Sequence, residues 1–186
     1  MKNNLELVIG CVCSGKSEEL LRRVNRYRIA GFSVLLLKPK IDTRSKGIRS
    51  RNGSSSACHE LASIGDIYKL LSGLKAESDL VIALDEAQFY PGLYPVVKDL
   101  LVRGHKVIVS ALDSDYNGEP FGDIPKLVTL SDDVLKLTAI CMSCLDDNAI
   151  FSQKLKKGGN QIEIGDLETY QPRCLKCFVP GGLSKK

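Results

Sequence analysis

The residues that most clearly support chemistry form a glycine-containing loop near the N-terminus. Residues 10–17 read GCVCSGKS, which fits the pattern G-x-x-x-x-G-K-[ST]. Glycines allow a tight turn in which successive N–H groups point at phosphate oxygens, and a following helix adds its positive end. The lysine of this pattern reaches the β- and γ-phosphates, and the hydroxyl after it binds Mg²⁺. We therefore predict an ATP-type site made by Gly10, Cys11, Val12, Cys13, Ser14, Gly15, Lys16 and Ser17.

Two adjacent carboxylates supply the other half of such a site. Asp85 ends the apolar run DLVIALD, where phosphate-loop enzymes place the carboxylate that organises Mg²⁺ together with Ser17. A plain turn-capping aspartate is the alternative. Glu86 follows directly, and a base in phosphoryl transfer mainly positions the attacking hydroxyl, so an ordinary carboxylate pKa of ~4.3 suffices. The residues themselves leave three roles open for Glu86: the base of a kinase, a base that activates water in an ATPase, or a structural group.

Four of the seven cysteines form two close pairs. Cys141 and Cys144 lie in CMSC, and Cys174 and Cys177 lie in CLKC. Four thiolates at this spacing suit a closed tetrahedral Zn²⁺ site with a structural role. Disulfides or unbound thiols are the alternatives.

The elements that would hold these residues follow from the apolar pattern. We predict buried strands at 5–9, 34–37, 79–84, 106–112 and 134–140, and helices at 17–30, 64–74 and 93–103. Alternating strands and helices indicate an α/β fold with a mainly parallel sheet. The segment 40–56 reads as a long loop. Its basic run RSKGIRSR, at 44–51, fits either a solvated loop or a phosphate contact.

Length and composition favour one main domain with a small appendage. The 186 residues are 44% hydrophobic and 26% charged, with a net charge of +4. The pattern changes at Cys141, so we expect a nucleotide-binding α/β domain over 1–140, a zinc-binding lobe over 141–180 and a short tail over 181–186. No apolar run approaches ~20 residues and the N-terminus lacks the pattern of a signal peptide, so we expect a cytoplasmic protein.

Taken together, these segments resemble the cellular, zinc-containing class of thymidine kinases. The likeness covers about residues 5–177 and includes GCVCSGKSEELLRRV, IDTR at 41–44, DEAQF at 85–89, ALDSDYNGEPFG at 111–122, KLTAICMSC at 136–144 and ETYQPRCLKC at 168–177. The resemblance implies a RecA-like phosphate-loop core with a zinc lobe. It also implies transfer of the γ-phosphoryl of ATP to the 5′-hydroxyl of thymidine, and of deoxyuridine, with Mg²⁺ accompanying ATP. A homotetramer inhibited by dTTP is expected, with no nucleic-acid or membrane partner.

The resemblance also assigns roles to single residues. Glu86 matches the catalytic base, and Asp42 and Arg44 match a flexible loop near the phosphates. The remaining assignments are Ala87 and Gln88 beside ATP, and Phe89, Leu112, Tyr116, Phe121, Ser152, Ile164 and Tyr170 around the nucleoside, with Tyr170 on a lasso-like loop. The match of Ser152 is loose, because one extra residue precedes it.

Two positions depart from the family pattern. Val12-Cys13 stands where the family often has Met-Phe, and Val12 matches the position that faces the methyl side of the base. A smaller side chain there predicts weaker discrimination against larger 5-substituents. Tyr116 replaces an aromatic residue that is often Phe.

A different class of function fits part of the sequence. DEAQ resembles a helicase motif and zinc ribbons often touch nucleic acid, so a nucleic-acid-binding ATPase is the alternative. Against it, 186 residues hold one phosphate-loop core, whereas helicases need two. A switch GTPase is disfavoured because no N-K-x-D motif is present.

Overall fold

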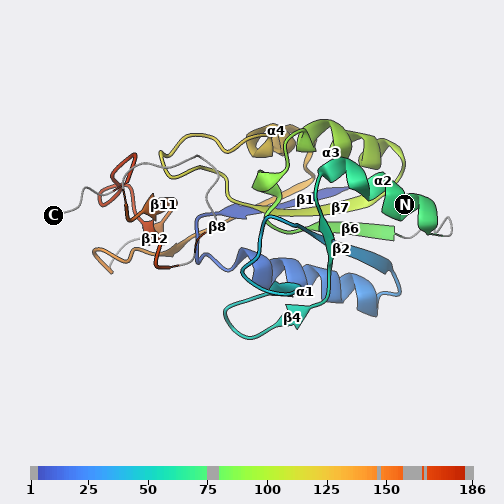
Figure 1. Ribbon diagram of the computed structural model, residues 1–186, viewed down its shortest axis with the longest axis horizontal. Helices are drawn as coiled ribbons and strands as arrows, with labels where there is room; N and C mark the ends of the chain where they lie inside the picture. Colours follow the sequence, from blue (N-terminus) through green and yellow to red (C-terminus); the bar gives the residue numbers. More distant parts are fainter. Residues whose placement is uncertain (1–3, 75–79, 146–147, 157–164, 166, 183–186) are drawn as a thin grey trace.

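A six-stranded parallel sheet forms the centre of the computed structural model, which describes residues 4–74, 80–145, 148–156, 165 and 167–182. The strand order is β5-β2-β6-β7-β1-β8 (Figure 1). The strands are β1 (Leu5–Gly10), β2 (Ser33–Pro39), β5 (His59–Leu61), β6 (Leu80–Leu84), β7 (Lys106–Ala111) and β8 (Asp133–Leu137). Every pairing within this sheet is parallel, so the α/β prediction is confirmed.

Helices cover both faces of the sheet, which explains why the strands are apolar throughout rather than alternating. The first helix, α1 (Lys16–Ile29), lies on one face; α2 (Ile67–Gly73), α3 (Leu93–Val102) and α4 (Ile124–Leu127) lie on the other (Figure 1). Side chains of β6 alternate between the two cores: Leu80, Ile82 and Leu84 pack on the side of α3, whereas Val81 and Ala83 pack on the side of α1.

The structure differs from the predicted elements in several places, and the short helix α4 is one element that was not predicted. The expected loop 40–56 contains a short hairpin, β3 (Ile48–Arg49) with β4 (Ser55–Ser56). The strand β5 was not predicted, because it has three residues and two of them are exposed. The expected strand 134–140 divides into β8 and β9 (Ala139–Ile140), since β9 leaves the large sheet to pair with β10 (Asn148–Ala149).

The cysteine-bearing part of the chain packs against the end of β1. It contains two small antiparallel pairs, β9 with β10 and β11 (Phe151–Lys154) with β12 (Tyr170–Arg173), at one end of the molecule (Figure 1). The thiol of Cys11 donates to the carbonyl of Ala149 at 3.3 Å, and the N–H of Val12 donates to the hydroxyl of Ser152 at 3.0 Å. The phosphate loop therefore has its shape set partly by residues about 140 positions later in the chain.

In the described part of the chain, no helix combines the length and apolarity that crossing a membrane requires.

Candidate active site

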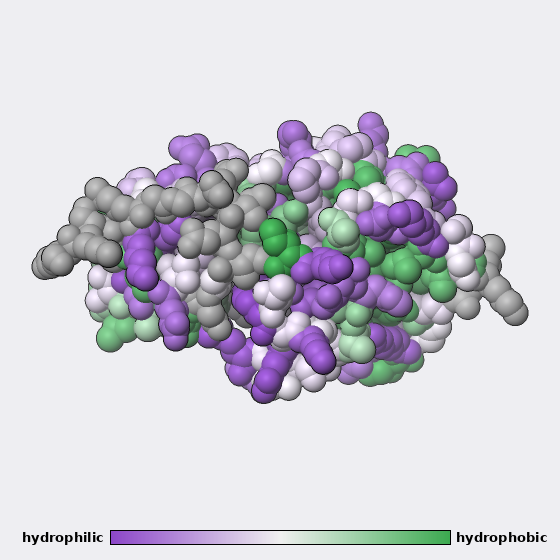
Figure 2. Space-filling model, viewed as in Figure 1, coloured by the Kyte–Doolittle hydropathy of each residue, from purple (hydrophilic) through white to green (hydrophobic). Residues whose placement is uncertain are grey.

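A cavity of about 610 Å³ opens where the parallel strands end. β1, β2, β6 and β7 all finish at this edge, because parallel strands bring their carboxyl ends together. Hydrophilic side chains gather on the face where the segment after β2 crosses the molecule (Figure 2). The predicted residues that line the cavity are Val12, Cys13, Ser14, Gly15, Lys16, Ser17, Asp42, Arg44, Asp85, Glu86, Phe89, Leu112, Tyr116, Phe121, Ser152 and Tyr170.

Four of the predicted residues that the structure describes do not line this cavity. Gly10 and Cys11 belong to the phosphate loop but do not face the cavity, and Ala87 and Gln88 are buried. Ile164 lies outside the described residues. Gly10 nevertheless shapes the loop: its φ is +148°, and a Cβ there would lie 2.2 Å from the carbonyl oxygen of Leu137.

Lys16 and Gly15 complete the turn into α1. Gly15 caps the helix in the left-handed conformation, with φ of 88°. The buried ammonium of Lys16 donates to the carbonyl of Cys11 at 2.7 Å, so the lysine spans its own loop and faces the cavity. This arrangement can receive phosphate oxygens on backbone N–H groups with a cation beside them.

Asp85 accepts hydrogen bonds from two hydroxyls. Ser17 donates to its Oδ2 at 2.9 Å, and Ser110 donates to its Oδ1 at 2.7 Å. Burial raises the pKa of Asp85 to about 6, the nearby Glu86 carboxylate adds to the increase, and the two hydroxyls oppose it. Carboxylate and hydroxyl oxygens are donors that Mg²⁺ prefers, so the side chains of Asp85 and Ser17 fit that ion. Ser110 was missed from the sequence, although a serine inside the apolar run KVIVSAL was a visible signal.

Glu86 reaches the same cavity as Asp85 because its backbone turns. Neighbours on a regular strand point to opposite faces, but Glu86 has φ of 50° and ψ of 37°, an unusual conformation for a residue with a side chain. Strained backbone of this kind is typical of functional positions. The carboxylate is held from both sides: Arg44 Nη2 donates to Oε1 at 2.5 Å, and Gln88 Nε2 donates to Oε2 at 2.6 Å.

Gln88 acts on Glu86 from outside the cavity. Its side-chain oxygen accepts the N–H of Leu112 at 3.0 Å, which orients the amide so that its nitrogen faces Glu86. The structure therefore places Gln88 as a support for the carboxylate rather than as part of the cavity wall.

Aromatic side chains also line the cavity. Phe89 and Phe121 meet edge to face, with ring centroids 6.0 Å apart. The ammonium of Lys154 lies 4.8 Å from the ring centroid of Tyr116. Together with Tyr170 and Leu112, these rings offer flat apolar surface suited to a planar base.

The basic loop after β2 also faces the cavity. Arg49, Arg51 and Asn52 line it, and Asn52 donates to the carboxylate of Glu18 on α1 at 2.7 Å. Of the two readings of the run RSKGIRSR, this placement favours a phosphate contact. Burial would lower the pKa of Arg44, but Glu86 and Asp42 raise it above its ordinary value, so the side chain stays charged.

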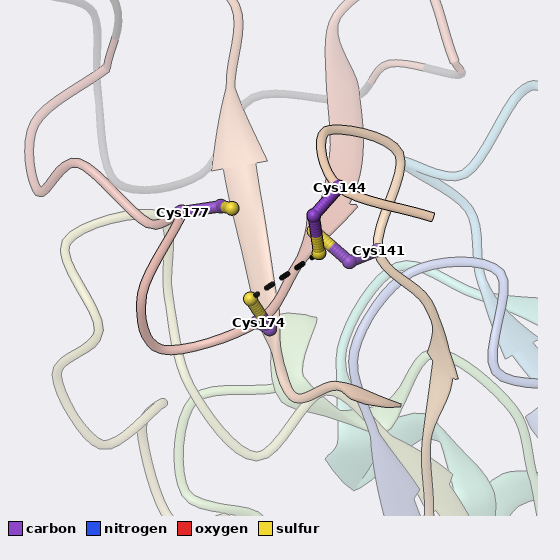
Figure 3. Close-up of side chains that lie close together, drawn as sticks. All are labelled: Cys141, Cys144, Cys174 and Cys177. Carbon is purple, nitrogen blue, oxygen red and sulfur yellow. Dashed lines mark hydrogen bonds between the residues drawn. The ribbon is translucent and has the colours of Figure 1, made fainter. Parts of the chain in front are cut away.

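The four paired cysteines converge on one point (Figure 3). Their sulfur atoms all lie within 4.8 Å of one another, and Cys144 and Cys174 are 3.9 Å apart. A disulfide needs sulfurs at about 2.05 Å, whereas sulfurs around a tetrahedral Zn²⁺ at ~2.3 Å lie about 3.8 Å apart. The seven cysteines all fall in the described part of the chain, and none is in a disulfide. The set can hold a metal such as zinc.

Comparison with known proteins decides the family. Residues 3–178 match the family model described as thymidine kinase. The chain belongs to the thymidine kinase family. It is similar to thymidine kinases of Coprothermobacter proteolyticus (40% identity, 95% of this chain and 91% of the relative), Metamycoplasma arthritidis (38%, 97% and 93%) and Bacteroides thetaiotaomicron (36%, 96% and 88%). The predicted resemblance is therefore confirmed, and the alternative of a nucleic-acid-binding ATPase is not favoured.

Proposed function

We propose that this chain is an ATP-dependent thymidine kinase, which transfers the γ-phosphoryl group of ATP to the 5′-hydroxyl of thymidine. One observation carries the proposal: a single cavity is lined by the phosphate loop, by aromatic side chains and by Glu86. A phosphoryl donor and a planar nucleoside can thus meet beside one carboxylate. Membership of the thymidine kinase family supports the same substrates.

Each part of the cavity then has a task in the reaction. Lys16 and the loop N–H groups bind the triphosphate, and Arg44 stabilises charge that develops on the transferred group. Glu86 accepts a hydrogen bond from the 5′-hydroxyl, aligns its oxygen with the phosphorus, and takes the proton late in the transfer. Phe89, Phe121 and the neighbouring tyrosines exclude water from the nucleoside.

Two metal ions belong to this proposal. Ser17 and Asp85 would hold Mg²⁺, which when bound neutralises charge on the phosphate oxygens. The four clustered cysteines would hold a structural Zn²⁺ that secures the small strands carrying Ser152 and Tyr170.

Further features of the proposal concern the protein as a whole. We infer that deoxyuridine is also a substrate, that dTTP inhibits, that the assembly is a homotetramer and that the enzyme is cytoplasmic. We also propose that the chain consists of a nucleotide-binding domain over 1–140, a zinc-binding lobe over 141–180 and a short tail over 181–186.

The decisive experiment measures dTMP and ADP formed from ATP and thymidine. Glu86→Gln keeps the shape of the side chain, so it should retain ATP binding by calorimetry while kcat falls by about 10²–10⁴-fold. Glu119→Gln, an exposed residue outside the cavity wall, is the matched control and should keep full turnover. Largely intact turnover in Glu86→Gln would show that Glu86 is not the base. ATP hydrolysis stimulated by DNA, with no dTMP, would replace the kinase with a nucleic-acid-dependent ATPase.

A further inference from the structure

Lys38 is a charged residue at a position where charge is costly. It is the penultimate residue of β2, and only 1% of its side chain is exposed. An unpartnered buried ammonium would be strongly destabilising, so its partners must provide substantial compensation. Lys38 does not line the cavity, and none of the tasks assigned above uses it.

The partners of Lys38 lie mainly in the segment that follows β2. Its ammonium donates to the backbone carbonyl of Asp42 at 2.9 Å and to that of Ser45. The carboxylates of Asp42 and Glu60 lie 3.9 and 3.5 Å away. Glu60 reaches it because the parallel register sets Lys38 beside Glu60 on β5. The closest bonds are therefore to main-chain carbonyls rather than to a side chain.

Those carbonyls belong to residues on either side of Arg44. Between β2 and β3 the described residues 40–47 form turns and bends without a helix or strand, so their course depends on contacts such as these. Arg44 leaves this turn to donate to Asp42 Oδ1 at 2.7 Å and to Glu86 Oε1 at 2.5 Å. A chain of contacts thus runs from the buried ammonium through the turn to the carboxylate in the cavity.

We propose that Lys38 is a positioning residue, whose buried ammonium holds the 42–45 turn so that Arg44 is presented to the transferred phosphoryl group and to Glu86. The inference rests on the proposed kinase function and adds a residue to it. Without the ammonium, the buried carbonyl of Asp42 and the partly buried carbonyl of Ser45 lose their donor, and the turn can adopt other conformations. Arg44 would then be displaced, and a displacement of about 1 Å can lower a rate by about 10²-fold.

Lys38→Met removes the charge while nearly keeping the length of the side chain. We expect kcat/KM for ATP to fall by about 10–100-fold, while KM for thymidine changes by less than about twofold, because the aromatic side chains that line the cavity are untouched. Lys40→Met is the matched control: the same residue type, two positions along, but exposed. It should leave both constants unchanged.

A test in the Arg44→Gln variant separates a positioning role of Lys38 from a general loss of structure. If Lys38 acts through Arg44, adding Lys38→Met to Arg44→Gln should lower kcat/KM by less than about threefold, because the group being positioned is already gone. Equal losses in both backgrounds would overturn the proposal, as would an unchanged kcat/KM in the single variant.

Limited trypsin digestion tests the turn without any activity measurement. Lys38→Met should be cut after Arg44 and Lys46 faster than the wild-type protein and Lys40→Met, while circular dichroism shows a folded protein in all three. Unchanged cutting would overturn the proposal. If wild-type protein forms no dTMP, the kinase function fails, yet this digestion still decides whether Lys38 holds the turn. Should Lys38→Met and the milder Lys38→Gln both fail to fold, Lys38 is a determinant of the fold and the positioning role is wrong.

Discussion

Arg23 connects three elements that support the phosphate loop, and removing its charge should destabilise the protein. It lies on α1, and its Nη1 donates to Glu6 on β1 and to Asp133 on β8, both at 2.6 Å. Its Nε donates to Glu19 of the same helix at 2.7 Å. The side chain of Arg23 is 8% exposed. The side chains of Glu6 and Glu19 are each 14% exposed, whereas that of Asp133 is 54% exposed.

The size of the effect follows from these exposures. Removing one partner of a buried ion pair costs about 3–5 kcal/mol, because the remaining charges keep their desolvation penalty. Glu6 would be left in that state, whereas Glu19 keeps its ion pair with Arg22 and Asp133 would be solvated by water. Arg23→Met retains the apolar stem, so packing along α1 is largely kept. We therefore expect a loss of about 3 kcal/mol in the free energy of unfolding.

The adjacent residue provides a control of the same type. Arg22 also pairs with Glu19, at 2.6 Å, but its side chain is 55% exposed. Exposed ion pairs contribute about 0–1 kcal/mol, so Arg22→Met should lower the free energy of unfolding by less than about 1 kcal/mol.

Urea denaturation followed by circular dichroism compares the two variants directly. The urea midpoint of Arg23→Met should fall clearly below that of Arg22→Met. The dependence of the unfolding free energy on urea concentration should be the same, because both variants expose the same surface on unfolding. Equal midpoints would refute the reasoning, because Arg23, which joins α1 to β1 and β8, would then stabilise the protein no more than the exposed Arg22 does.

Two further predictions concern the cavity wall and the cysteines. Val12→Met keeps the backbone N–H that bonds to Ser152 and enlarges only the side chain, so the ratio of kcat/KM for thymidine to that for bulkier 5-substituted analogues should rise. The expected change in this ratio corresponds to ~1–3 kcal/mol. Equal ratios in the wild-type protein and Val12→Met would show that Val12 does not face the 5-position. Cys144→Ser should lower the zinc content per chain and the thermal midpoint, whereas Cys58→Ser, outside the cluster, should change neither the metal nor the lobe. Full zinc content in Cys144→Ser would contradict a four-cysteine site.

Much of the sheet could be predicted because its signals are local. Four of the five predicted strands coincide closely with β1, β2, β6 and β7, since strands covered on both faces are continuous apolar runs. The edge strands were harder. β5 has only one buried residue of three, and β8 continues in sequence into residues that belong to another sheet, so neither boundary has a local marker.

The candidate site also has features that the sequence predicts and features that it does not. Its phosphate loop, its carboxylate pair and its cysteine spacing are short patterns, and sequence could identify them together with the family. The positions of Ser110 on Asp85, Gln88 behind Glu86 and Lys38 beneath the 42–45 turn could not be predicted, because each depends on a partner that only the folded chain brings near.

The sequence by itself determined which chemical groups this protein has and in what order, because loop, strand and ligand spacings are set by neighbours a few residues apart. The tertiary structure decided how those groups face one another. Glu86 shares a cavity with Asp85 only through its left-handed backbone, and Arg44 meets Glu86 only because the turn after β2 folds back across the sheet edge. Such contacts join residues tens of positions apart, and they exist only once the strands have assembled in the order β5-β2-β6-β7-β1-β8.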